Sequence, residues 1–324
     1  MTRVTAGRDI SVHFRGDWGE SNLHRVCGWY SQQLGDRFGA GSRFAIWNGR
    51  GAADNVAAVA SGDADIALVT PAQFAAMAYL GIGPYRGSAH RHLRALACLP
   101  HRDRLLFATT RRDISTLADL AVATPTPVLT APHNNGVNHV GLAVDEIITR
   151  AGASVSELRR HGDGLVESDH SLEWFDMIAQ HKADVIAMEA IMLPNWRQLA
   201  NDTELTFLPL PADIGSELER TFGWRTATLK AGYFPSLTTD LTCLDFSDFL
   251  VITTSDLDDD VARAVAECTW ETRDHLERQY RHLPPERSPL TYPLLLDALA
   301  RTPIPLHPAA ADYFDTISSL EAHR

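Results

Sequence analysis

The chain has 324 residues, more than one compact core usually holds, so we expect two domains of about 130 to 160 residues each. Hydrophobic residues make up 45% and charged residues 22% of the chain, which is typical of a globular protein and excludes a disordered one. The formal net charge of −12, without any run of Lys or Arg, argues against nucleic acid and anionic membrane surfaces as partners.

The first part of the chain alternates strands with helices. Strands are predicted at residues 10–14, 44–47 and 66–69, and the helices that follow them at 23–38, 52–60 and 73–80. Between each strand and its helix lies a polar loop. Such alternation predicts a mainly parallel sheet that is covered by helices on both faces.

A second set of elements follows a crossover near Arg104. A strand at 93–99 precedes this crossover. The elements predicted after it are strands at 105–109, 128–131, 185–188 and 205–208, and helical stretches at 115–120, 137–151, 171–181 and 196–200. One apolar strand within 241–253 is expected to return the chain to the first domain, before a long helix that ends near Tyr280. The sequence therefore predicts a two-lobed α/β protein, with residues 1–104 and 242–324 in lobe 1 and residues 105–241 in lobe 2.

Four polar loops mark the places where a ligand would bind. In open α/β sheets, ligands bind at the carboxyl ends of strands, where helices begin with unpaired N–H groups. The four loops are 17–22, 48–55, 70–73 and 132–138. Capping of the following helix explains any one of them, with Asn22, Thr70 and Asn135 as cap candidates, but four loops at corresponding places favour a ligand cleft.

The candidate ligand-binding residues in and near these loops share small size or hydrogen-bonding side chains. They are Asp17, Trp18, Glu20, Ser21, Asn48, Gly49, Arg50, Gly51, Asn55, Thr70, Gln73, His133, Asn134, Asn135 and Glu189. Arg50 is the fixed positive charge of the set: its planar guanidinium could take a carboxylate in two parallel hydrogen bonds, or it could simply be exposed.

Metal and cofactor chemistry find little support in the sequence. His90 and His92 have no evident third ligand, and the loops contain no GxGxxG or Walker sequence, so we expect neither a metal nor a nucleotide cofactor. The acidic run at 256–260 lacks the Gly and distal Glu of a calcium loop. Its acids instead suit the N-terminus of a helix, where they meet the positive end of the helix dipole.

Three of the four cysteines, Cys98, Cys243 and Cys268, are predicted to be buried free thiols. Cys27, Cys98, Cys243 and Cys268 lie far apart, and no two of them form a CxxC pair. Cys27 is the one near a candidate ligand loop, but no arrangement of His and Asp in the sequence supports it as a nucleophile.

Several segments together resemble a known family, the TAXI group of solute receptors for tripartite (TRAP) transporters. Segments that resemble its motifs, in the same order, are 48–55 with Val59, Gly62 and Asp65, then 114–120, 231–235 and 304–310. Two departures are visible. Ala52 and Ala53 stand where the family usually has Gly and Ser, and residues 133–136 replace its second glycine-serine loop.

The resemblance implies a periplasmic type II binding-protein fold that closes around a ligand between its lobes. It implies a small carboxylate or amino acid as the ligand, membrane components of a TRAP transporter as candidate partners, and a monomer that needs no cofactor. Tyr233 lies in the segment that resembles the family's crossover loop. The resemblance implies that its ring packs on the ligand or, alternatively, within a hinge.

Two other functions stay open. The first is an enzyme on the same fold, by resemblance only, with His133, Cys27, Glu20 and Glu189 as candidate groups. The second is an intracellular ligand sensor. No apolar run reaches the roughly 20 residues that span a bilayer, and residues 1–8 lack the apolar core of a secretory leader. We therefore expect an extracytoplasmic protein if a leader was removed and a cytoplasmic one if Met1 is the native start.

Overall fold

The computed structural model describes residues 7–16, 22–123, 128–130, 136, 139–160, 165–167 and 173–322. The contacts within the chain divide it into two compact units. Unit 1 consists of Met1–Arg102 and Ser247–Arg324, and unit 2 of Asp103–Phe246. The chain therefore passes from unit 1 into unit 2 and back again.

Unit 1 is built on a five-stranded sheet. In order across the sheet, its strands are β2 (Arg43–Asn48), β1 (Ser11–Gly16), β3 (Ile66–Val69), β12 (Phe249–Thr254) and β4 (Leu93–Leu99). Strands β1, β2 and β3 are parallel, whereas β12 is antiparallel to both of its neighbours. Because β1, β2 and β3 point the same way, the loops that follow them lie along one edge of this sheet.

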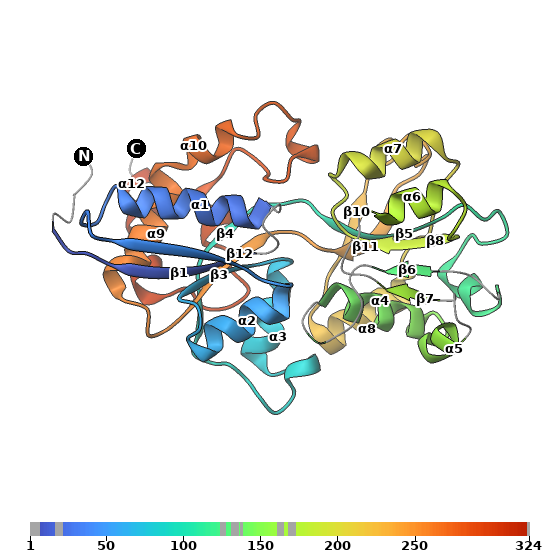
Figure 1. Cartoon of the computed structure of the whole chain (residues 1–324), viewed down its shortest axis with the longest axis horizontal. Helices are drawn as coiled ribbons and strands as arrows, with labels where there is room; N and C mark the ends of the chain where they lie inside the picture. Colours follow the sequence, from blue (N-terminus) through green and yellow to red (C-terminus); the bar gives the residue numbers. More distant parts are fainter. Residues whose placement is uncertain are drawn as a thin grey trace. The chain divides into compact units, whose positions relative to one another are not determined.

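Helices cover both faces of the unit 1 sheet (Figure 1). On one face lie α1 (Asn22–Gly35), α9 (Asp259–Glu271) and α12 (Pro308–Ala322), and on the other α2 (Ala52–Ser61) and α3 (Ala72–Leu80). The short helix α11 (Leu296–Ala300) packs in the same core as α1, α9 and α12. Shorter elements are η1 (Gly83–Tyr85), α10 (Arg273–Arg278) and η3 (Pro285–Arg287). Alternate residues of β1, including Val12 and Phe14, are buried against the first group, and Phe14 stacks on Tyr30 with ring centroids 6.4 Å apart.

Unit 2 is built on a mixed sheet. Its strands are β10 (Thr226–Leu229), β11 (Leu241–Asp245), β5 (Arg104–Thr109), β8 (Val185–Met188), β6 (Val128–Thr130) and β7 (Leu165–Glu167), with β9 (Thr206–Phe207) paired to β5. The run β8-β6-β7 is parallel and the other pairs are antiparallel. The entering strand β5 and the leaving strand β11 are antiparallel neighbours in this sheet.

The helices of unit 2 also lie on both faces of its sheet (Figure 1). They are η2 (Leu117–Ala121), α4 (His139–Arg150), α5 (Val155–Arg160), α6 (Glu173–Ala179), α7 (Pro194–Asp202) and α8 (Ala212–Phe222). Trp196 of α7 is fully buried and meets the edge of Phe175 at 5.3 Å between ring centroids. Two sheets, each flanked by helices, confirm the predicted α/β fold class. None of the helices described in either unit is long and apolar enough to cross a bilayer.

Two predicted elements differ from the structure. The single apolar strand expected within 241–253 is in fact two strands, and its first half, β11, belongs to unit 2. The break comes at Asp248, whose φ of 72° leaves the extended region and whose carboxylate accepts the His101 N–H at 3.1 Å. The long helix expected up to Tyr280 is interrupted at Thr272, whose φ of −110° and ψ of 14° are not helical, and α10 follows directly.

The acidic run before that helix acts as predicted. Asp258 is the N-cap of α9 and accepts the N–H of Asp260 at 3.0 Å. Arg8 binds the same carboxylate at 2.6 Å. These acids therefore start a helix and form a surface ion pair.

Candidate functional site

The loop between β2 and α2 crosses the carboxyl ends of two parallel strands. The Gly49 N–H donates to the Gly16 carbonyl at 2.7 Å, so the loop is held against the end of β1. A Cβ at residue 49 would lie 1.9 Å from Asn55 Oδ1 and 2.8 Å from that carbonyl oxygen. Gly51 follows with a φ of 135°, where side chains other than glycine are strained. Glycine is therefore needed at both positions.

Asp54 fixes the backbone of Arg50. Its Oδ2 accepts the Arg50 N–H at 3.0 Å and binds the Arg15 guanidinium at 2.6 Å. The Arg15 and Asp54 side chains are 25% and 16% exposed, so this ion pair is only partly screened by water. The Arg50 side chain is exposed, and we find no ion pair between it and another described residue. Arg50 therefore presents a guanidinium on a fixed piece of backbone.

Asn55 connects the β2–α2 loop to the neighbouring strand β3. Its side chain is buried, and its Nδ2 donates to the Leu68 carbonyl of β3 at 2.8 Å. Its Oδ1 is buried without a hydrogen-bond partner. The N-cap of α2, Gly51, has no side chain that could accept the first N–H groups of the helix. This helix start is therefore open to an acceptor from outside the loop.

The loop between β3 and α3 lies on the same edge of the sheet. Thr70 follows β3, and its Oγ1 is buried without a partner. Gln73 is buried in the first turn of α3. The Ala72 N–H donates to the carbonyls of Ser247 and Asp248, so the start of α3 is already occupied by backbone. The structure thus brings together seven predicted site residues along this edge: Asn48, Gly49, Arg50, Gly51, Asn55, Thr70 and Gln73.

The two predicted residues of unit 2 that the structure describes, Glu189 and Tyr233, lie in one cluster around the loop that follows β8. The Glu189 carbonyl accepts the Trp196 Nε1–H at 3.1 Å. The Tyr233 hydroxyl donates to the Ile191 carbonyl at 3.5 Å, and its ring meets the edge of Phe234 at 4.9 Å. Tyr233 therefore helps to hold the loop that carries Glu189.

Asp103 belongs to the same cluster and was missed by sequence reasoning. Its buried carboxylate accepts the N–H groups of Ala190 at 2.9 Å and Ile191 at 3.0 Å. In the sequence it is one Asp in a polar turn, and nothing near it marks it as special. The partners that do mark it lie more than eighty residues further along the chain.

Seven predicted site residues lie outside the described residues: Asp17, Trp18, Glu20, Ser21, His133, Asn134 and Asn135. Their roles stay predictions. The cysteines, in contrast, can be placed: all four are free and buried, as was predicted for Cys98, Cys243 and Cys268. Burial raises the pKa of the Cys27 thiol to about 12, so it is a thiol at neutral pH and not a nucleophile.

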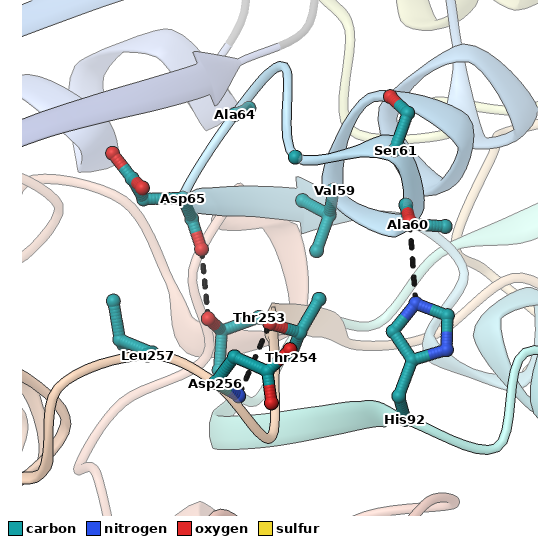
Figure 2. A pocket seen from close by; sticks show the side chains of 11 residues that line it. Val59, Ala60, Ser61, Ala64, Asp65, His92, Thr253, Thr254, Asp256 and Leu257 are labelled. Atoms are coloured by element: carbon teal, nitrogen blue, oxygen red, sulfur yellow. Dashed lines mark hydrogen bonds between the residues drawn. The ribbon is translucent and has the colours of Figure 1, made fainter.

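A cavity of about 340 Å³ lies elsewhere in unit 1 (Figure 2). It is lined by Val59, Ala60, Ser61, Gly62, Ala64, Asp65, His92, Thr253, Thr254, Asp256 and Leu257. These residues surround the end of α2 and the start of β3, at the sheet edge opposite the candidate loops. The Thr253 hydroxyl donates to the Asp65 carbonyl at 2.7 Å, and His92 Nε2 lies 3.2 Å from the Ala60 carbonyl oxygen. No predicted ligand residue lines this cavity.

The two α/β units, each with a helix-covered sheet, define the class of periplasmic binding-protein folds. A structure described as a periplasmic transporter matches with a TM-score of 0.51 and 8% identity, over 97% of this chain and 96% of that chain. The alkanesulfonate-binding protein SsuA from Xanthomonas axonopodis pv. citri is similar with a TM-score of 0.44 and 12% identity, over 98% of this chain and 94% of that chain. An adipate-bound protein from R. palustris is similar with a TM-score of 0.49 and 15% identity, over 97% of this chain and 93% of that chain.

Residues 39–316 match the model of the NMT1-like family, so the chain belongs to that family. The match includes the β2–α2 loop, most of unit 1 and all of unit 2. A comparison with curated proteins finds no match.

Proposed function

We propose that this protein is a solute-binding receptor that captures a small polar or anionic molecule, a carboxylate or amino acid, for a TRAP-type transporter. The observation that carries the proposal is the exposed Arg50 guanidinium on a loop fixed by Asp54, beside the open N-terminus of α2. The transporter class rests on the resemblance of residues 48–55, 231–235 and 304–310 to the TAXI receptors.

The charges of this loop favour an anionic group. The Arg15 guanidinium is already bound by the Asp54 carboxylate. Arg50, in contrast, gives this carboxylate only its backbone N–H. The Arg50 side chain is therefore left for a ligand carboxylate, which it can bind in two parallel hydrogen bonds. The positive end of the α2 dipole adds to this attraction.

Two oxygen atoms near the same loop favour a second group on the ligand. Asn55 Oδ1 and Thr70 Oγ1 are both buried without partners, and a buried polar atom without a partner costs about 1 to 3 kcal/mol. Either oxygen can accept a hydrogen bond from an ammonium or hydroxyl group. A carboxylate that also carries a donor, as in an amino acid or hydroxy acid, fits both parts of the loop.

The test begins with the ligand itself. Native mass spectrometry of the purified protein would identify a co-purified molecule, and a thermal-shift screen of carboxylates and amino acids would rank its relatives. A ligand at a hundredfold excess over its Kd stabilises the folded state by about 2.7 kcal/mol. A broad screen without any thermal shift would count against a receptor for such solutes.

Arg50→Ala then tests the site. We expect it to weaken binding of the anionic ligand by about 1.5 to 3 kcal/mol, the usual contribution of a hydrogen bond to a charged group, measured by calorimetry. The matched control is Arg43→Ala, because Arg43 is an exposed arginine at the other end of the same strand. Equal affinities of the two variants would place Arg50 on the solvated surface.

A further inference from the structure

The buried carboxylate of Asp103 is bound almost entirely by backbone. Asp103 is the first residue of unit 2 and is 5% exposed. Its Oδ1 accepts the N–H groups of Arg104 at 2.7 Å and Ile191 at 3.0 Å, and its Oδ2 accepts the Ala190 N–H at 2.9 Å. Its own carbonyl accepts the Phe246 N–H at 3.0 Å. One residue thus holds both ends of unit 2 and the loop after β8.

That loop needs to be held. Ala190 has a φ of 60°, in the left-handed region that residues other than glycine rarely adopt. Such a conformation persists only where the surroundings enforce it. The Trp196 indole and the Tyr233 hydroxyl bind the carbonyls on either side of Ala190, and Asp103 binds the N–H groups. The carboxylate is the charged member of this set of anchors.

We propose that Asp103 is a positioning residue: its ionised carboxylate fixes the backbone at Ala190 and Ile191, and thereby sets where Glu189 presents its side chain to a ligand. The anchoring of the loop stands on the hydrogen bonds alone. The step from Glu189 to a ligand rests on the proposed receptor function.

The charged side chains near the Asp103 carboxylate bind other groups, so its negative charge is stabilised mainly by the backbone N–H groups. The Arg104 guanidinium donates to the Asp103 carbonyl and, at 3.0 Å, to the Asp245 carboxylate of β11. Arg225 also lies 3.9 Å from Asp245, and Glu189 is a like charge on the loop itself. Burial raises the pKa of Asp103 to about 6. A modest fall in pH therefore neutralises the anchor.

Protonation has two effects of opposite sign. A carboxyl group whose pKa is raised by folding stabilises the folded state fully below about pH 4, and this contribution is lost as the pH rises through about 6. Acidification from pH 7 to 5 therefore stabilises the fold through Asp103. It simultaneously weakens the anchor, because a neutral carboxyl group accepts N–H hydrogen bonds more weakly than a charged carboxylate. A residue with only a structural role would not separate these two readouts.

Hydrogen exchange at the Ala190 and Ile191 amides, measured by NMR, tests the anchor. At pH 5 about nine-tenths of Asp103 is protonated, so protection at Ala190, corrected for the intrinsic rate, should fall about tenfold from its value at pH 7. Asp103→Asn should show low protection at both pH values. Asp119→Asn is the matched control, because this surface carboxylate of unit 2 also accepts two backbone N–H groups, from Ser115 and Thr116.

Ligand affinity, measured with the solute found by native mass spectrometry, completes the test. Asp103→Asn and Glu189→Gln should each weaken ligand binding several-fold at pH 7. The fold-loss in affinity of the double variant should be smaller than the product of the fold-losses of the two single variants. Protection at Ala190 that does not change with pH in the parent would overturn the anchor, even if the Asp103 variant fails to fold. Unchanged affinity in variants with a loosened loop would overturn the positioning role and leave the receptor function standing. A parent that binds no solute would instead overturn the receptor function, whatever the exchange data show.

Discussion

Asp54 in unit 1 and Asp103 in unit 2 perform the same task in different surroundings. Each carboxylate accepts backbone N–H groups of a loop that follows a strand and precedes a helix. Asp54 is 16% exposed and faces the Arg15 guanidinium at 2.6 Å. Asp103 is buried and relies on three N–H groups, which leaves its charge only partly compensated. The difference teaches that burial, rather than the chemistry of the carboxylate itself, lets a modest fall in pH release the Asp103 anchor.

The two loops also reach their conformations by different means. The unit 1 loop uses glycine at positions 49 and 51, where close contacts and a positive φ leave no room for a side chain. The unit 2 loop places an alanine, Ala190, at a positive φ and holds it by hydrogen bonds. The first loop should therefore be sensitive to added volume, and the second to loss of its anchors.

The largest effect is expected from Gly49→Ala. The new Cβ would meet Asn55 Oδ1 and the Gly16 carbonyl, so the free energy of unfolding should fall by about 3 kcal/mol, at the upper end for an overpacked site. Urea titration measures it. The control is Gly28→Ala inside α1, where a Cβ meets nothing within 4 Å and a gain of up to about 1 kcal/mol is expected. Equal stability of the two variants would remove the packing argument for the unit 1 loop.

His139 is a buried group of unit 2 whose effect on stability changes with pH in the opposite direction to that of Asp103. Burial lowers its pKa to about 4, so its contribution to stability is full above about pH 6.5 and is lost as the pH falls toward 4. Between pH 7 and 5 this amounts to about 2 kcal/mol. His139→Gln should remove that slope, while any offset at pH 8 reports the structural cost of the substitution. Parallel pH profiles of parent and variant would contradict the prediction.

A smaller effect is expected when the unit 1 anchor is removed. Asp54→Asn breaks a partly buried ion pair with Arg15, and should lower the free energy of unfolding by about 1 kcal/mol at pH 7. Asp63→Asn is the control, because Asp63 is an exposed carboxylate that accepts only from the neighbouring Ser61 hydroxyl among the hydrogen bonds described. Stability of the Asp54 variant equal to that of the control would mean that glycine packing alone holds this loop.

The smallest effect is expected from Tyr233→Phe. Its hydroxyl lies 3.5 Å from the Ile191 carbonyl oxygen, a long hydrogen bond, so the loss of stability should be about 0.5 kcal/mol. Tyr313→Phe is the control, because the Tyr313 hydroxyl is buried without a partner and its removal should cost nothing. An unchanged melting temperature combined with weaker ligand binding would instead assign the Tyr233 hydroxyl to the ligand.

The sequence by itself determined the fold class and the elements of unit 1 from β1 to α3. Apolar residues at every second position mark β1, and apolar residues at nearly every fourth position mark α1, because each of them buries one face in the same core. The strand β3 is instead a short apolar run, because all four of its residues are buried. The glycine positions of the β2–α2 loop could also be predicted, because close approach and positive φ are properties of the backbone at that place. Eight elements were not predicted: η1, η3, α11 and α12 in unit 1, and α5, β7, α8 and β10 in unit 2.

Only the tertiary structure decided how the strands pair and which carboxylates act as anchors. The apolar stretch 241–253 reads as one strand, and its division between the units depends on Asp248, which binds the N–H of His101 147 residues away. Asp103 and its partners Ala190 and Ile191 are separated by 87 and 88 residues. Local pattern contains no information about such a distant partner, because burial and hydrogen bonding across the sheet arise only when the chain has folded.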